Sequence, residues 1–310
     1  MFFNLTFDKN LTTGYIARVK NGKRNGAIVK WTDKNTDQKE ERELYYSDYE
    51  KEFKVFPSRE RQRMFKLVER MYNGGSDTDE DEGVDDKLKE VYKMVKEKED
   101  AKKQFQLHGE EVFVPVLNKD KHFFYYITGA SESGKSYVAS MLIESYRKLY
   151  PKRHVFLISK LAKDETLDKL KFIKRLDLDT FVKDPPKVEE FEKSLVVFDD
   201  YENLPPALFS IVLNLIKDIG IQGRHASIDG IVISHLATDY TKTKVVLSEA
   251  THFCVFPHHN SYQSMESLLK TYCGFKTTQI SGLRGMHSRW VIIHRRAPNY
   301  LLGEKSVELI

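Results

Sequence analysis

From Glu110 onward, short apolar runs alternate with longer segments whose apolar residues recur at helical spacing. Short apolar runs bounded by turn signals are typical of buried strands. The strand-like runs are Val112–Val116, Phe123–Thr128, His154–Ile158, Leu195–Asp199, Gly230–Ser234 and His252–Phe256, with Arg289–His294 as a further strand at an edge. The helix-like segments are Lys135–Leu149, Asp164–Lys174, Pro205–Ile219 and Ser261–Tyr272. Strands that alternate with helices predict an α/β fold with a mostly parallel sheet covered on both faces.

The first 110 residues follow a less regular pattern. Leu11–Asp33 has the alternation and the central turn residues of a β-hairpin. Glu50–Tyr72 places its apolar residues on one helical face, and Asp86–Gln104 is a highly charged helix with a narrow apolar stripe. The acidic run Gly74–Asp86 has almost nothing to bury, which predicts a disordered loop. We therefore expect a small N-terminal α+β module over residues 1–72, a linker over 73–109 and the main domain over 110–310.

Composition narrows the class of protein. No apolar run approaches the roughly 20 residues that a membrane span needs, so we expect no span. The N-terminus lacks the basic region of a secretory signal, and two cysteines, Cys254 and Cys273, make no disulfide framework. These features favour a reducing intracellular compartment. The net charge of +4 permits a polyanionic partner without requiring one.

A glycine-rich motif after the strand Phe123–Thr128 carries the clearest chemistry. The run Gly129, Ala130, Ser131, Glu132, Ser133, Gly134, Lys135 and Ser136 fits the phosphate-binding P-loop pattern G-x-x-x-x-G-K-[ST]. Its glycines let backbone N–H groups turn towards phosphate oxygens, and Lys135 brings a charge to the β- and γ-phosphates. The Ser136 hydroxyl is a ligand for Mg²⁺. A chance match is the alternative, but the preceding strand and the following helix argue against it.

Two carboxylates end a later apolar strand. Asp199 and Asp200 follow Leu195–Phe198, at a plausible distance from the P-loop for the acidic strand that completes a nucleotide site. We expect Asp199 to hold Mg²⁺ and Asp200 to orient the attacking water, with Glu202 as a fallback base. The alternative is that these acids only cap the next turn.

The order of the motifs favours ATP over other nucleotides. The strand His154–Ile158 falls between the P-loop and the acidic strand in sequence, as in the RecA-like (ASCE) branch of P-loop proteins with an extra central strand. That branch consists mostly of ATPases and motors. We also find no N-K-x-D-like guanine-binding motif. The sequence therefore predicts a P-loop NTPase fold with ATP and Mg²⁺ as cofactors.

Two stretches after the acidic strand carry a family resemblance. Gly223-Arg224-His225 precedes a strand that ends in Ser234-His235, and Glu249-Ala250-Thr251-His252-Phe253 opens the next strand. This order resembles the viral DNA-packaging ATPases of the FtsK–HerA clade, as found in poxviruses, giant viruses and virophages. The resemblance covers roughly Phe123–Ile310.

The resemblance implies roles for two further residues. Arg224 matches the arginine finger that reaches a neighbouring subunit's ATP, with Arg284 and Arg289 as rival candidates and a surface salt bridge as the alternative. His235 occupies the position of a polar sensor where the family usually has glutamine. Histidine can donate a hydrogen bond but also titrates near neutral pH, so its geometry is a departure from the family pattern.

The function implied is an ATP-hydrolysing motor that translocates double-stranded DNA into a viral capsid. Its partners would be duplex DNA, further copies of itself in a homo-oligomeric ring, and capsid or portal-vertex proteins. It would act at the viral assembly site in the host cytoplasm or nucleus, or in the virion. Two alternatives stay open: a cellular HerA-like or helicase-type translocase, and a nucleotide-dependent assembly scaffold that hydrolyses ATP poorly.

Two other groups of residues have weaker signals. His252, Cys254, His258, His259 and Cys273 invite a zinc site, but they lack a C-x-x-C pair, and core or surface roles fit better. The hairpin cations Lys20, Lys23, Arg24 and Lys30 are either DNA-phosphate contacts or a solvated turn.

Overall fold

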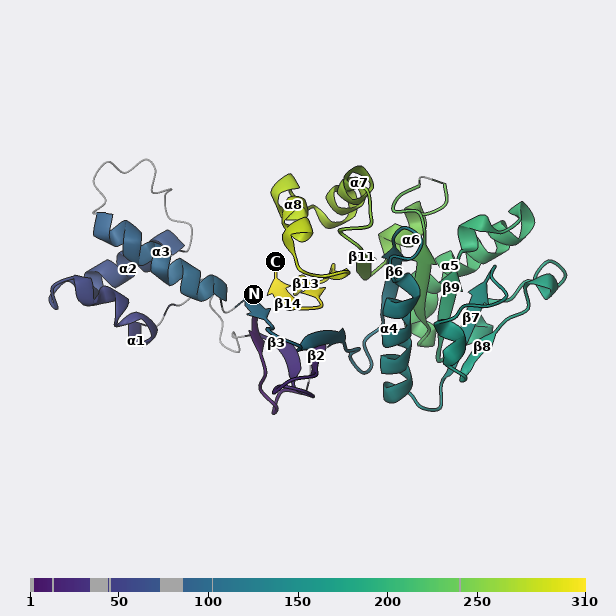
Figure 1. Ribbon diagram of the computed structural model, residues 1–310, viewed down its shortest axis with the longest axis horizontal. Coiled ribbons are helices and arrows are strands. Elements are labelled where there is room, and N and C mark those ends of the chain that lie inside the picture. The colour runs from purple at the N-terminus through teal and green to yellow at the C-terminus, as the bar shows by residue number, and fades with distance from the viewer. Residues whose placement is uncertain are drawn as a thin grey trace. The chain divides into compact units, whose positions relative to one another are not determined.

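The computed structural model describes residues 3–12, 14–33, 44, 46–72, 86–101, 103–239 and 241–310. The acidic run expected to be a disordered loop lies almost entirely outside these residues. The chain divides into two units (Figure 1). The larger unit consists of Phe7–Lys30, Gln106–Glu308 and Ile310, and the smaller unit of Met1–Thr6, Trp31–Phe105 and Leu309.

A sheet of mostly parallel strands forms the centre of the larger unit, with neighbours in the order β14-β13-β12-β11-β6-β10-β9-β7-β8. Its parallel strands are β6 (Phe124–Thr128), β7 (His154–Ser159), β8 (Ile173–Arg175), β9 (Ser194–Asp199), β10 (Asp229–Ser234) and β11 (His252–Val255). Every residue of β6, β9, β10 and β11 is buried, as expected for strands covered on both faces.

The strand order places β10 between β6 and β9, as the RecA-like branch requires. The expected strand at His154–Ile158 exists as β7, but it lies on the far side of β9 and is not the inserted strand. Because β6, β10 and β9 are parallel neighbours, their carboxyl ends meet at one edge of the sheet. Ser234 is paired with Thr128, and Ile233 with Asp199. The motifs that end these strands therefore converge.

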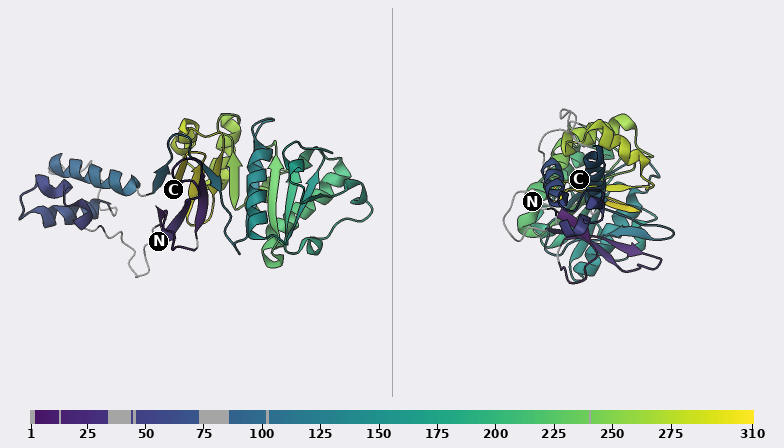
Figure 2. Two further views of the ribbon diagram at one scale, coloured as in Figure 1. Left: turned by 60° about the horizontal axis from the view of Figure 1, so that its bottom comes forward. Right: turned by 90° about the vertical axis from the view of Figure 1, so that its left-hand side faces the viewer.

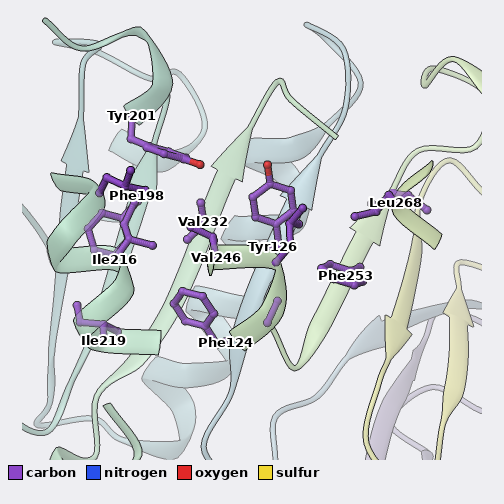
Figure 3. Packing of buried hydrophobic residues seen from close by; sticks show 14 of the residues in the cluster. Phe124, Tyr126, Phe198, Tyr201, Ile216, Ile219, Val232, Val246, Phe253 and Leu268 are labelled. Atoms are coloured by element: carbon purple, nitrogen blue, oxygen red, sulfur yellow. The ribbon is translucent and has the colours of Figure 1, made fainter. Parts of the chain in front are cut away.

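Helices cover both faces of this sheet. They are α4 (Lys135–Leu149), α5 (Pro206–Ala226), α6 (Lys244–Glu249), α7 (Tyr262–Cys273) and α8 (Thr277–Gly285). Phe124 and Tyr126 pack with Phe198, Ile216 and Ile219 on the α5 face (Figure 3). Tyr146 of α4 packs edge-on against Phe123, whose side chain points to the opposite face from that of Phe124.

One expected helix is wrong. The segment Asp164–Lys174 contains only a 3₁₀ turn at Leu167–Lys169 and the first residues of strand β8. The Asp164 carboxylate accepts hydrogen bonds from the N–H groups of Thr166 and Leu167, which favours a tight turn over a helix. Further 3₁₀ turns lie at Leu178–Thr180, Val188–Phe191 and Tyr201–Asn203.

The C-terminal strands extend the sheet with antiparallel pairs. They are β12 (Val291–His294), β13 (Tyr300–Gly303) and β14 (Ser306–Leu309). The strand expected at an edge, β12, is instead enclosed between β11 and β13.

The predicted hairpin is present as β2 (Tyr15–Lys20) and β3 (Ile28–Asp33). It does not stand apart from the main domain, because β2 pairs with β5 (Val112–Pro115) in a small antiparallel sheet. Arg24 in the turn forms a salt bridge of 2.7 Å with Glu111.

The smaller unit has a helical core. It contains α1 (Tyr46–Tyr49), a 3₁₀ turn at Glu52–Val55, α2 (Arg61–Tyr72) and α3 (Asp86–Ala101), together with the strands β1 (Phe3–Thr6) and β4 (Gln104–Gln106) near its boundary. Helices α2 and α3 pack side by side (Figure 2). Their shared core contains Phe53, Phe65, Val68, Val91 and Val95, each almost fully buried. No helix among the described residues is long and apolar enough to cross a membrane.

The close packing around Gly230 gives a test of this fold. A Cβ atom on Gly230 would lie 2.3 Å from Cδ2 of the buried Phe124 ring. We expect Gly230→Ala to lower the free energy of unfolding by about 1–3 kcal/mol, because the ring has no room to move. Gly282→Ala is the control, since a Cβ there meets nothing within 4 Å on an exposed helix. Thermal melting should show destabilisation for the first variant only; equal melting temperatures would contradict this packing.

Candidate nucleotide-binding site

The P-loop connects the carboxyl end of β6 to the first residue of α4. Glu132 and Gly134 have positive φ angles of 63° and 106°, so the backbone folds back on itself before the helix begins. Residue 129 has no room for a side chain, since a Cβ on Gly129 would lie 2.6 Å from Ser133 Oγ and 2.7 Å from the Phe256 ring. The loop is thus held against β11, and the amino end of α4, with its positive dipole, faces the site.

Lys135 lies at the centre of the loop and is buried. Its ammonium donates hydrogen bonds of 2.9 Å to the carbonyl oxygens of both Gly129 and Ala130. Burial lowers the pKa of Lys135, while the nearby charges of Asp200 and Asp199 act in the opposite direction. The cation is therefore held by neutral carbonyl dipoles within reach of two carboxylates.

Ser136 and Asp199 are each hydrogen-bonded to another oxygen-bearing side chain. The Ser136 hydroxyl donates a hydrogen bond of 3.0 Å to Asp164 Oδ2, and Asp199 Oδ2 accepts one of 3.0 Å from Ser159. Burial raises the pKa of Asp199 to about 6, and the charges of Asp200 and Asp164 contribute in the same direction. Hydroxyl and carboxylate oxygens are the donors that Mg²⁺ prefers, so Ser136 and Asp199 fit the predicted metal.

Asp164 is a site residue that sequence reasoning missed. It fell within a segment expected to be helical, where it looked like a first-turn acid. The available signal was the pattern of an aspartate two residues before Thr166, which is typical of an Asx turn.

His235 lies between the P-loop lysine and the second aspartate. Its Nδ1 is 3.3 Å from Lys135 Nζ, and its Nε2 is 2.9 Å from Asp200 Oδ1. An Nδ1 that accepts from the ammonium leaves the proton on Nε2, which faces the carboxylate. Asp200 itself has a left-handed backbone with φ of 52°, which turns its side chain into the site. Three predicted site residues therefore form one row.

Glu202 fixes the end of β10. Its Oε1 accepts a hydrogen bond of 2.6 Å from the backbone N–H of His235 and one of 2.9 Å from the Ser234 hydroxyl. The side chain is buried, so its position and that of His235 are coupled. This geometry favours a positioning role over the expected role as a fallback base.

The three candidate arginines lie in different places. Arg224 is in the last turn of α5, and its neighbour Gly223 lies close to His122. Because His122 precedes β6 and the P-loop follows it, Arg224 lies at the opposite end of the strands from the P-loop. Arg289 Nη2 lies 3.6 Å from the position that a Cβ would occupy on Gly134, which places this guanidinium next to the P-loop of its own chain. Arg284 lies over the Tyr262 ring and donates to the Asn260 carbonyl.

Of the residues considered for zinc, His252 and Cys254 are buried, whereas His258 and His259 are exposed. The buried His252 ring stacks on Tyr125 at 4.1 Å, and burial holds its pKa well below the usual range. Cys254 is buried in β11. Among the described residues, no three His, Cys, Asp or Glu side chains form a group that could hold a metal ion.

The hairpin cations divide into two pairs. Arg24 is bound to Glu111, and the buried Lys30 donates to the carbonyl groups of Asp8 and Leu11. Lys20 and Lys23 are exposed. The hairpin therefore has fewer free cations than its sequence suggests.

By sequence, the chain is similar to a virophage protein. The chain is 32% identical over 227 residues to the uncharacterised protein V3 of Sputnik virophage, covering 72% of this chain and 92% of V3. No family model matches.

Solved structures give weaker similarities. The DNA-packaging ATPase B204 of Sulfolobus turreted icosahedral virus is 16% identical, with a TM-score of 0.42 over 63% of this chain and 100% of that chain. The pCW3 conjugation coupling protein TcpA with bound ATPγS is 11% identical, with a TM-score of 0.44 over 65% of each chain. Similarity at this level does not bear on the chemistry of the site.

The raised pKa of Asp199 predicts a pH-dependent cost to stability. The ordinary pKa of 3.8 rises to about 6 in the fold. Below pH 3.8 the side chain is protonated in both states and costs no folding stability. As pH rises through 6 the buried carboxyl must ionise, and the free energy of unfolding falls. The loss amounts to about 3 kcal/mol at most. We expect Asp199→Asn, measured without metal or nucleotide, to melt above the wild type at pH 7.5 and close to it at pH 4.5. A melting difference that is independent of pH would contradict this assignment.

Proposed function

Because this chain belongs to the family of the virophage protein V3, and because its site has the order and residues of an ATP-hydrolysing P-loop enzyme, we propose that it is an ATPase motor that translocates double-stranded DNA during viral genome packaging. The sequence resemblance to the FtsK–HerA packaging ATPases supports the same function. The motor would work at the site of viral assembly.

The observation that carries the proposal is the row formed by Lys135, His235 and Asp200. A residue that binds phosphate, a residue at the sensor position and a carboxylate suited to orient water come from three separate strand ends. Structural acids that only cap a turn would have no reason to face the P-loop lysine. The row therefore favours hydrolysis over simple nucleotide binding.

Each residue has a role in this proposal. Backbone N–H groups of the P-loop and the Lys135 ammonium bind the β- and γ-phosphates. Ser136 and Asp199 would hold Mg²⁺, which would supply charge neutralisation at the phosphates, and Asp164 orients the Ser136 hydroxyl. Asp200 orients the attacking water.

His235 links these events to conformation. A phosphate that draws the Lys135 ammonium away from Nδ1 removes one of the two polar neighbours of the imidazole. The ring is then positioned by Asp200, while the backbone N–H of His235 stays hydrogen-bonded to Glu202. Glu202 would pass this change to the end of β10.

Arg224 is assigned as a finger that acts between subunits. It lies too far along α5 to serve its own P-loop, so it requires a neighbouring copy, which fits a homo-oligomeric ring around duplex DNA. Arg289, next to Gly134, is assigned to the nucleotide of its own chain. Capsid or portal-vertex proteins are the expected further partners of such a ring.

A DNA-stimulated ATPase assay tests the motor. We expect duplex DNA to raise hydrolysis several-fold, and Lys135→Ala to abolish it, because the variant lacks the charge that binds the β- and γ-phosphates. Asp200→Asn should retain ATP binding but lose turnover. Hydrolysis that ignores duplex DNA would rule out translocation. Negligible and equal rates for wild type and Asp200→Asn would identify a nucleotide-dependent scaffold. This second candidate is favoured by the direct contact of Lys135 with His235, which stands where the family usually has glutamine.

Paired arginine variants test the finger. Arg224→Ala should keep ATP affinity and lose turnover by about 10³-fold or more, because the finger acts on the transferring phosphoryl group. Arg289→Ala, the comparison variant, should weaken ATP binding to the isolated subunit. Mixing Arg224→Ala with Lys135→Ala should restore part of the turnover, since each variant supplies what the other lacks. Normal hydrolysis by Arg224→Ala alone would remove this residue from the mechanism.

A further inference from the structure

The smaller unit carries a row of exposed cations along one side of α2. Arg63, Lys66 and Arg70 follow one another at intervals of three and four residues, and Arg59 lies in the turn just before the helix. Residues at this spacing share one helical face. At about 1.5 Å of rise per residue, the three helical cations extend over roughly 10 Å.

The opposite side of α2 is fixed by the core. Phe65 and Val68 are 6% and 0% exposed, and α2 packs through them against α3 and the 3₁₀ turn Glu52–Val55. The cations therefore cannot turn inward without unpacking the helix. The nearby acid, Glu69, accepts a hydrogen bond from the Leu44 N–H instead of facing the row.

The charges of the row are not neutralised within the described ranges. Within the described residues, the charged groups of these four side chains have no hydrogen-bond or ion-pair partner. Other cations of the chain behave differently: Lys98 of α3 lies 2.5 Å from Glu52, and Arg175 is paired with Asp168. On α3 the exposed lysines also alternate with Glu90 and Glu97. The exposed side of α2 is thus mainly cationic, and Glu60, three residues before Arg63, is the exposed acid beside the row.

We propose that this row, Arg59, Arg63, Lys66 and Arg70, binds the phosphate backbone of duplex DNA. The proposal deepens the function proposed above and rests on it, since it assigns a DNA contact to the unit that lacks the nucleotide site. Duplex DNA presents about one negative charge per 1.7 Å of its axis, so a straight row of cations can meet several phosphates. Arginine and lysine dominate the row, with Gln62 as the one exposed amide beside it. Such long cationic side chains suit phosphates more than base edges, so binding should depend little on sequence.

Salt dependence of DNA binding tests the proposal on the full chain. A triple variant, Arg63→Gln with Lys66→Gln and Arg70→Gln, removes three phosphate contacts. The slope of log affinity against log salt concentration, measured by fluorescence anisotropy with a 30-base-pair duplex and no nucleotide, should become shallower by about 2.7. Changing the two arginines to lysine should keep most of the slope, because the contact depends on charge.

A matched variant controls for net charge. Lys174, Lys183 and Lys187 are exposed in the larger unit, and glutamine at all three removes the same charge from places where Asp177, Asp184 and Glu189 lie nearby in sequence. Its slope should stay close to that of the wild type. ATP hydrolysis without DNA should be unchanged in both triple variants, which verifies that the P-loop domain is intact.

The outcomes separate the two proposals. A slope in the α2 variant equal to that of the wild type overturns the α2 contact and leaves the motor standing. Binding to polyglutamate, a probe for acidic protein surfaces, is measured in the same way. If the α2 variant loses binding to polyglutamate but binds duplex DNA as the wild type does, the α2 contact is also overturned, because the partner is then an acidic protein surface. A wild-type chain that binds no duplex DNA overturns both.

Discussion

The structure of the site depends on one buried cation. The Lys135 ammonium is held between two P-loop carbonyl groups and the His235 ring, with Asp199 and Asp200 close enough to affect its pKa. A buried charge without partners is costly, so the loop, the sensor strand and the acidic strand must keep a common geometry. A negative phosphate satisfies the same cation better than neutral dipoles do. The ligand-free arrangement is therefore poised to change when a triphosphate binds.

The strand order determines which residues can take part in that change. Placing β10 between β6 and β9 brings His235 and Asp200 to the same sheet edge as the P-loop. The short hydrogen bonds that Glu202 accepts from the Ser234 hydroxyl and the His235 backbone N–H then make the end of β10 one rigid element. A histidine in place of the family's usual glutamine has two ring nitrogens, and here they face partners of opposite charge. That property would connect a bound phosphate to Asp200, the acid proposed to orient water, within one side chain.

Local motifs were predictable from the sequence, whereas contacts between distant segments were not. The P-loop, α4 and the acidic strand followed from residues whose neighbours in sequence are also neighbours in space. Asp164 was missed because its role comes from a capped turn that replaces an expected helix, and only the fold brings it to Ser136. Arg289 is separated from the P-loop by more than a hundred residues, so its position next to Gly134 has no local signal. The inserted strand was expected in principle but assigned to the wrong segment, because sequence order does not give sheet order.

In the proposed motor, the two units would rely on different kinds of interaction. Nucleotide binding needs groups fixed by burial, and the sheet supplies buried strands whose ends cannot move independently. Holding a moving duplex needs contacts that form and break without a large barrier, which exposed and solvated cations provide through screened charge alone. A surface such as the row on α2 gives no sequence selectivity and falls in strength as salt rises. Those are the properties that allow DNA to slide past a protein while the chemistry in the P-loop stays strictly ordered.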